Sequence, residues 1–143
     1  MPEPDYTCEA CGFSIETPVR RLSASTVGLF PDRRLPGRCV LVLDTHHEHF
    51  EALPAALASR FMADTQRVAR AVRAVSGSAR INYAMLGNQV AHLHMHVMPR
   101  GGPGDSNPKV SPWELPEPEA PLEEAERTRL VQALRNAIDA DQA

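Results

Sequence analysis

The hydrophobic positions of the chain predict several strands. Residues 38–45 (RCVLVLDT) form a continuous run of β-branched and aliphatic residues, which is typical of a buried strand. Residues 79–85 (ARINYAM) and 90–98 (VAHLHMHVM) predict two further strands, and residues 19–30 predict one or two short ones. Pro and Gly residues separate these segments, as expected for turns between strands.

Two other segments have the period of a helix. From about residue 53 to residue 75, five apolar residues share one face: Leu57, Phe61, Val68, Val72 and Val75. Residues 122–140 repeat the pattern with Leu130, Leu134 and Ile138. The order of strands, helix, strands, helix predicts an α+β fold. In this fold an antiparallel sheet of about five strands packs against one long helix and a C-terminal helix.

The chain has 143 residues, which predicts one domain spanning residues 1–143. Residues 99–121 contain seven prolines and three glycines. We expect an extended segment there rather than a linker, because too little chain follows it to form another core.

The composition excludes some classes of function. A net charge of −3 argues against a general nucleic-acid binder. No run approaches the about 20 apolar residues of a membrane span. The N-terminus lacks the apolar stretch of a secretory signal, and the odd count of three cysteines does not predict a disulfide framework. A cytoplasmic protein is therefore expected.

Three of the six histidines fall within five residues, at His92, His94 and His96. Alternate residues of a strand point to the same face, so the three imidazoles are expected together on one face. The intervening residues point to the core: Leu93, Met95 and Val97. Imidazole can attack as a nucleophile, donate a proton or bind a metal near neutral pH. An inert histidine face and a triplet bound entirely to metal are the alternatives.

Cys8 and Cys11 have C-x-x-C spacing, which lets two thiolates chelate one zinc ion. A thioredoxin-type site is disfavoured because no βαβ pattern follows, and two inert cysteines are the other alternative. The third cysteine, Cys39, is expected to be a core residue. A closed zinc site needs two more ligands. His92 is one candidate, and the other lies in the segment 46–49 (HHEH).

Residues 92–98 (HLHMHVM) resemble the His-φ-His-φ-His-φ-φ signature of the histidine triad (HIT) family of nucleotide hydrolases and transferases. The preceding INYAMLGNQVA is similar to the strand and phosphate-contacting turn of that family. The strand at residues 38–46, followed by a long helix, is similar to the preceding strand and helix of the family, and the N-terminal C-x-x-C is similar to its zinc-binding bacterial branch. The resemblance implies a single HIT-like domain, with residues 1–18 as a zinc-knuckle segment, and a homodimer.

The resemblance also implies a mechanism. His94 would attack the α-phosphorus of a nucleoside phosphate derivative, such as a dinucleoside polyphosphate or a nucleoside phosphoramidate, to form a nucleotidyl-histidine that water hydrolyses. His96 would contact a phosphate oxygen or the leaving group. A nucleotidyltransferase would use the same histidine with a different acceptor. A zinc-stabilised nucleotide-binding protein with negligible turnover is the other alternative, but such a protein would not need a nucleophile at His94.

The remaining site residues follow from the same resemblance. His92 would be a zinc ligand, and His46 is favoured over His47 and His49 as the fourth ligand. A structural zinc would then be bound by Cys8, Cys11, His46 and His92. Three further residues are expected to bind substrate: Asn82, Asn88 and Gln89. Gln89 stands where many members of the family carry a serine or threonine.

Overall fold

The computed structural model describes residues 6–141. In that part of the chain, five antiparallel strands form one sheet in the order β1-β2-β3-β5-β4. The strands are β1 (Pro18–Arg21), β2 (Ser25–Leu29), β3 (Cys39–Leu43), β4 (Arg80–Ala84) and β5 (His94–Arg100). The predicted α+β fold is confirmed. The first five residues of the predicted N-terminal segment 1–18 lie outside the described residues, as do residues 142–143.

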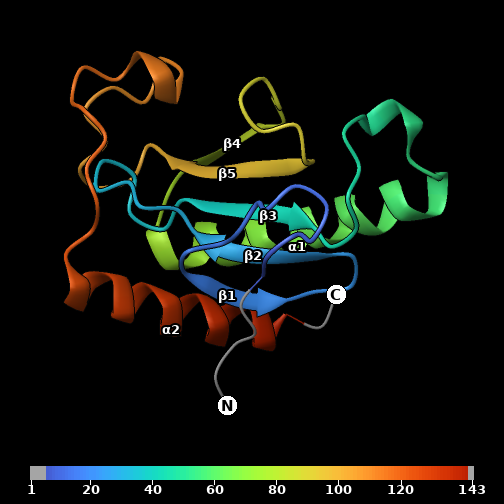
Figure 1. The fold of residues 1–143 in the computed structure, drawn as a ribbon. Coiled ribbons are helices and arrows are strands. Elements are labelled where there is room, and N and C mark those ends of the chain that lie inside the picture. Colours follow the sequence, from blue (N-terminus) through green and yellow to red (C-terminus); the bar gives the residue numbers. More distant parts are fainter. Residues whose placement is uncertain (1–5, 142–143) are drawn as a thin grey trace.

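Two helices accompany the sheet within these residues: α1 (Ala55–Ser76) and α2 (Glu124–Ala140). Their bounds match the predicted 53–75 and 122–140 within about two residues. Figure 1 shows α1 behind the sheet and α2 along its β1 side. Two short 3-10 helices, η1 (Phe50–Ala52) and η2 (Pro112–Glu114), lie in the connections. None of the helices in residues 6–141 is both long enough and apolar enough to cross a membrane.

The two faces of the central strands have different roles. One face joins the helices in the main core through Cys39, Leu41, Leu43, Met95 and Val97. The other face of β3 carries Val40 and Val42, which lie opposite His96 and His94 in the register of β3 and β5. Because paired residues project from the same face of a sheet, both histidines point away from α1.

The N-terminal segment covers part of this second face. Thr7 forms a β-bridge with Ser14, and Gly12 takes the left-handed conformation that closes the turn between them. Three residues of the segment pack against Val40 and Val42: Tyr6, Cys8 and Ile15. Gly28 of β2 permits this close approach, because a Cβ there would collide with the side chain of Ile15.

The histidine strand differs in its bounds from the predicted 90–98. Strand β5 begins only at His94, and His92 lies in the bend before it. The strand also continues through Pro99, which pairs with Ile81. Proline is tolerated there because the pairing with β3 ends at Val97, so no strand on that side requires its missing N–H. His92 is therefore free to turn toward other partners than His94 and His96.

The Pro-rich segment folds back along the sheet and is held by a buried ion pair. Arg100, at the end of β5, lies 2.8 Å from Asp105 through its Nε. The same guanidinium donates to the main-chain oxygens of Asn107 and Val110, each at 2.7 Å. These bonds fix the connection that carries η2 to the second face of the sheet.

Candidate active site and metal cluster

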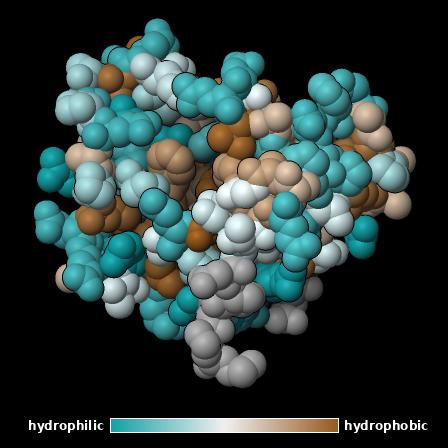
Figure 2. All heavy atoms as spheres, in the orientation of Figure 1, coloured by the Kyte–Doolittle hydropathy of each residue, from teal (hydrophilic) through white to brown (hydrophobic). Residues whose placement is uncertain are grey.

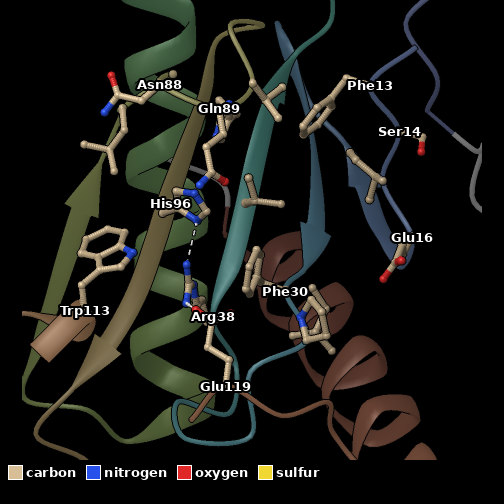
Figure 3. A pocket seen from close by; sticks show the side chains of 18 residues that line it. Phe13, Ser14, Glu16, Phe30, Arg38, Asn88, Gln89, His96, Trp113 and Glu119 are labelled. Atoms are coloured by element: carbon tan, nitrogen blue, oxygen red, sulfur yellow. Dashed lines mark hydrogen bonds and ion pairs between the residues drawn. The ribbon is translucent and has the colours of Figure 1, made fainter. Parts of the chain in front are cut away.

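A cavity of about 600 Å³ opens on the face of the sheet that points away from α1. Its walls come from the N-terminal segment, the ends of β2 and β3, the β4–β5 loop, β5 and η2 (Figure 3). Figure 2, in the orientation of Figure 1, shows apolar side chains around a recess in this face. His94 and His96 both line the cavity, and His92 does not line it. The structure therefore brings two of the three triad histidines into one cavity.

The ring of His94 is held in one tautomer. Its Nδ1 lies 2.7 Å from the main-chain oxygen of His92. A carbonyl oxygen can only accept, so Nδ1 carries the proton and donates it. In the neutral ring Nε2 is then unprotonated and has a free electron pair. Phe13 stacks on this ring at a centroid distance of 5.5 Å. This is the arrangement that a nucleophilic imidazole requires.

The ring of His96 is held in the opposite tautomer. Nη2 of Arg38 lies 3.2 Å from its Nδ1. Figure 3 marks this contact with a dashed line. A guanidinium only donates, so Nδ1 accepts and the proton of the neutral ring is on Nε2. Burial, the charge of Arg38 and the neighbouring His94 lower the pKa of His96 to about 4. His96 is thus a neutral hydrogen-bond donor at pH 7.

Arg38 was not singled out by the sequence. It is almost fully buried, and its Nη1 lies 2.9 Å from Asp32 and 3.4 Å from Glu119. The guanidinium also lies over the ring of Phe30, 3.9 Å from its centroid. The signal in the sequence is weak: a single charged residue directly before a buried apolar strand.

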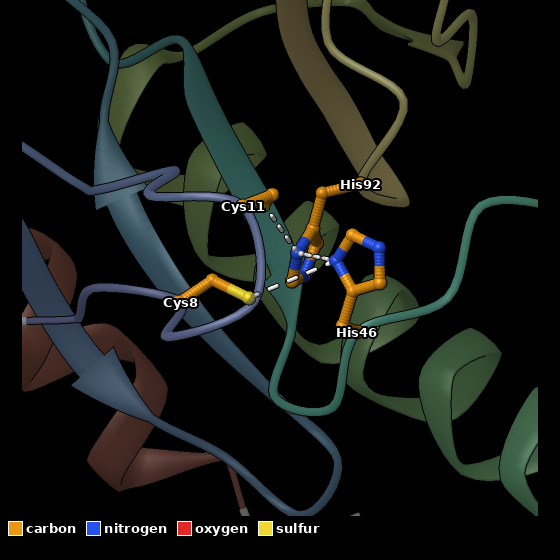
Figure 4. A group of neighbouring side chains, drawn as sticks. All are labelled: Cys8, Cys11, His46 and His92. Atoms are coloured by element: carbon orange, nitrogen blue, oxygen red, sulfur yellow. Dashed lines mark hydrogen bonds between the residues drawn. The ribbon is translucent and has the colours of Figure 1, made fainter.

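The four predicted zinc ligands meet beside the cavity (Figure 4). One ligand atom from each of Cys8, Cys11, His46 and His92 lies within 4.8 Å of the other three. His46 Nδ1 and His92 Nδ1 are 3.2 Å apart, Cys11 Sγ and His92 Nδ1 are 3.5 Å apart, and Cys8 Sγ and His46 Nδ1 are 3.7 Å apart. A tetrahedral zinc ion with bonds of about 2.0–2.3 Å separates its ligand atoms by roughly 3.3–3.8 Å.

The hydrogen bonds around the cluster also fit a metal. Nε2 of His92 lies 2.7 Å from the main-chain oxygen of Leu43, so it donates and leaves Nδ1 unprotonated toward the cluster. Nε2 of His46 faces Glu48 at 3.5 Å, which favours the same tautomer. Burial raises the pKa of the Cys8 thiol, but hydrogen bonds from the amides of Cys11 and Ala10 and from the side chains of Cys11 and His46 together hold the pKa below its usual value. Two thiols and two facing imidazole nitrogens form a donor set that zinc prefers.

The other histidines of the 46–49 segment lie elsewhere. The ligand group contains His46 and neither His47 nor His49. His49 is largely exposed and lies 3.7 Å from Glu51. The side chain at position 46 therefore has the geometry expected of the fourth ligand.

The predicted substrate-binding residues divide into two groups. Asn88 and Gln89, in the β4–β5 loop, line the cavity. Asn82 does not line it, because its Oδ1 accepts a hydrogen bond from Nη1 of Arg100 at 3.1 Å. Trp113 reaches the cavity from η2 and packs against His96 in a T-shaped arrangement. Phe13, which follows the C-x-x-C and Gly12, was missed in the sequence although it stacks on both His92 and His94.

Comparison with known proteins identifies the family. Residues 27–102, more than half of the chain, match the HIT domain, so the chain belongs to the HIT domain family. That family includes nucleotide hydrolases and transferases and binds nucleotides. A comparison with curated proteins gave no match.

Solved structures of HIT proteins share the fold. The histidine triad protein of Sinorhizobium meliloti is 26% identical, with a TM-score of 0.76 over 85% of this chain and 88% of that one. The histidine triad protein of Bradyrhizobium japonicum is 27% identical, with a TM-score of 0.75 over 85% and 89%. A zinc-bound histidine triad family protein of Mycobacterium smegmatis is 25% identical, with a TM-score of 0.61 over 85% and 83%.

Proposed function

We propose that this protein is a nucleotide hydrolase in which His94 attacks the α-phosphate of a dinucleoside polyphosphate or a nucleoside phosphoramidate. The observation that carries the proposal is the 2.7 Å hydrogen bond from Nδ1 of His94 to the main-chain oxygen of His92. It leaves Nε2 of His94 unprotonated in a residue that lines the cavity.

The reaction has two displacements. Nε2 of His94 forms a bond to the α-phosphorus, and the bond from that phosphorus to the leaving group breaks. Water then attacks the same phosphorus, the phosphorus–nitrogen bond breaks, and His94 is restored. Between the two steps, Nδ1–H stays bonded to the oxygen of His92 and stabilises the positive charge on the ring.

His96 acts on the leaving group by hydrogen bonding. Because the neutral ring has only one proton, on Nε2, full transfer of that proton would leave an imidazolate. We therefore assign His96 a donor hydrogen bond to an oxygen of the departing phosphate, which leaves as its anion. A departing amine would instead take its proton from solvent. Loss of this donor should therefore slow the reaction more strongly as the leaving group becomes more basic.

The rest of the cavity suits a nucleotide. Aromatic and apolar side chains form two of its walls: Phe13, Phe30, Leu86, Val90 and Trp113. We assign the nucleoside to this part, because bases bind against aromatic and apolar surfaces. The amides of Asn88 and Gln89 are assigned to the phosphates, since both can donate hydrogen bonds. We do not assign Asn82 to the phosphates, because its Oδ1 already accepts a hydrogen bond from Arg100.

We further propose a structural zinc ion bound by Cys8, Cys11, His46 and His92. Four protein ligands leave no position open for a substrate, so the ion would join the N-terminal segment to the bend before β5. The zinc-bound relative from Mycobacterium smegmatis supports this assignment. The thiols must stay reduced to bind the metal, which is consistent with a cytoplasmic protein.

A homodimer is the assembly we propose. Strand β4 is at the edge of the sheet, and Tyr83 within it and Leu86 just after it are both more than half exposed. An open edge with exposed apolar side chains is suited to pairing with a second copy. Sedimentation equilibrium at micromolar concentration should give about twice the 15.7 kDa chain mass. A 15.7 kDa species alone would contradict the dimer.

A panel of dinucleoside polyphosphates and nucleoside phosphoramidates, with product analysis in the presence and absence of inorganic phosphate, tests the function. A hydrolase releases the nucleoside monophosphate in both conditions, and a nucleotidyltransferase gives the phosphate adduct. The His94→Ala variant is the control. Nucleotide binding without turnover by wild-type protein would contradict the proposal and favour a nucleotide-binding protein.

A further inference from the structure

Besides its ion pair with Asp32, Arg38 contacts the ring of His96. Nη1 of its guanidinium lies 2.9 Å from Asp32, and Nη2 lies 3.2 Å from Nδ1 of His96. Asp32 already has a second cation, because Nε and Nη2 of Arg34 both lie 2.9 Å from its carboxylate. Arg38, by contrast, lines the cavity and Arg34 does not. The two arginines therefore share one carboxylate but differ in their access to the histidine.

The planar guanidinium fixes this geometry. Its two terminal nitrogens point in set directions, so a bond to Asp32 through Nη1 aims Nη2 at His96. The face of the guanidinium is covered by Phe30, whose ring also packs against His96 in a T-shaped arrangement. Arg38 and His96 are thus held together by packing as well as by the hydrogen bond.

We propose that Arg38 is the positioning residue that holds His96 as its Nε2–H tautomer, so that His96 presents a hydrogen-bond donor to the leaving phosphate. The catalytic part of this inference rests on the proposed function. The structural part, the tautomer of His96, stands on the two hydrogen bonds of Arg38. Without Arg38 a neutral ring would be free to place its proton on either nitrogen, and the Nδ1–H form has no donor on Nε2.

Charged and titratable groups of both signs lie around His96, and the two that contact it oppose its protonation. Arg38 on the β3 side and His94 on its own strand both disfavour a second proton. The carboxylates of Asp32 and Glu119 lie behind Arg38, on its Nη1. Glu16 lies in the lining of the same cavity, on the N-terminal segment. With Arg38 removed, burial still opposes protonation of His96, but the repulsion from the nearest cation is gone.

Nitrogen-15 NMR of the unliganded protein, labelled on histidine, measures the tautomer directly. In wild type, the ring of His96 should be the neutral Nε2–H form from about pH 5.5 to pH 8. This arm needs no variant and no substrate. A wild-type ring in the Nδ1–H form, or one that titrates near pH 6.5, would overturn the inference.

Arg38→Met and Arg34→Met form a matched pair, since each removes one guanidinium from Asp32 and leaves the other. Arg38→Met should mix the two tautomers of His96 and raise its pKa toward the usual value, while Arg34→Met should leave both unchanged. Kinetically, Arg38→Met should lower kcat by about 10-fold or more and make it pH-dependent, with a smaller effect on KM. Equal effects of the two variants on the tautomer would reduce Arg38 to structural support and overturn the inference.

The two proposals fail separately. If wild type shows the Nε2–H tautomer but forms no nucleotidyl-histidine, the proposed function fails and the relation of Arg38 to His96 stands. If wild type hydrolyses nucleotides through His94 but Arg38→Met keeps the tautomer and kcat, the role of Arg38 fails and the function stands.

Discussion

The main-chain oxygen of His92 accepts the hydrogen bond that orients the ring of His94, at 2.7 Å. The side chain of His92 meanwhile points Nδ1 into the cysteine and histidine cluster, 3.5 Å from Cys11 and 3.2 Å from His46. One residue therefore contacts the candidate metal site through its side chain and the candidate nucleophile through its main chain. Movement of His92 would displace the acceptor that His94 needs.

The first prediction concerns the metal. Purified protein should contain about one zinc ion per chain by elemental analysis. Replacement of Cys8 and Cys11 by serine together should abolish the metal content and lower the melting temperature, because a structural zinc contributes to folding. Nucleotide hydrolysis should fall only to the extent that loss of the metal disturbs the fold and the position of His94.

Cys39→Ser is the matched control for the metal. Cys39 is fully buried in the main core, where burial raises the pKa of its thiol to about 12, and it is not part of the cluster of four ligands. This variant should lose stability but keep one zinc ion. Unchanged metal content in the double variant of Cys8 and Cys11 would rule out the proposed ligands.

Phe13 should matter for nucleotide binding rather than for metal binding. Its ring stacks on His94 and lines the cavity, so Phe13→Leu removes one aromatic wall. We expect a loss of about 0.5–1.5 kcal/mol in binding, or up to about a 10-fold rise in KM, with zinc content unchanged. Phe50→Leu, in the exposed η1, is the control. Equal KM values for all three proteins would contradict this role.

The pH dependence of stability should report the buried His96. Burial first, and then Arg38 and His94, lower its pKa to about 4 in the folded protein, below the usual 6.5. Between these values the unfolded chain binds a proton that the folded protein does not. The free energy of unfolding should therefore fall as pH decreases from about 7 to 4, by no more than about 3 kcal/mol. Urea denaturation of wild type and His96→Gln at pH 7.5 and pH 4.5 isolates the contribution of His96 to the unfolding free energy. The same pH slope in both proteins would contradict it.

The Arg100 and Asp105 pair should be important for the Pro-rich connection. Both side chains are almost fully buried, so Asp105→Ala leaves a buried guanidinium without its counter-ion. We expect a loss of about 3–5 kcal/mol in unfolding free energy. Arg129→Ala, which breaks the exposed pair with Glu126, should cost less than about 1 kcal/mol. Similar losses for the two variants would show that the buried pair is not the cause.

Much of this architecture follows from local pattern. The continuous apolar run of β3, the alternation in β5 and the period of 3.6 in α1 and α2 are each set by residues a few positions apart, which is why those elements were predicted. The same local spacing indicated Cys8 with Cys11 and His94 with His96. The bend at His92 could not be predicted, because its direction depends on Leu43 and His46, which lie more than 40 residues away.

The missed residues have long-range causes. Arg38 is a site residue only because β3 pairs with β5 and brings it to His96, 58 residues later. Asn82 was expected at the substrate because it lies before the triad, but a tertiary hydrogen bond from Arg100 decides its direction. The sequence alone does not show which of several possible hydrogen-bond partners a polar side chain will meet in the fold.

Rapid chemical quench of wild type with a nucleotide labelled on its α-phosphorus tests the central claim most directly. The account predicts an acid-labile nucleotidyl group on the protein, located by mass spectrometry at His94. It predicts no adduct in His94→Ala, in which turnover falls by several orders of magnitude while nucleotide binding persists. A label on another residue, or near-normal turnover by His94→Ala, would contradict the account.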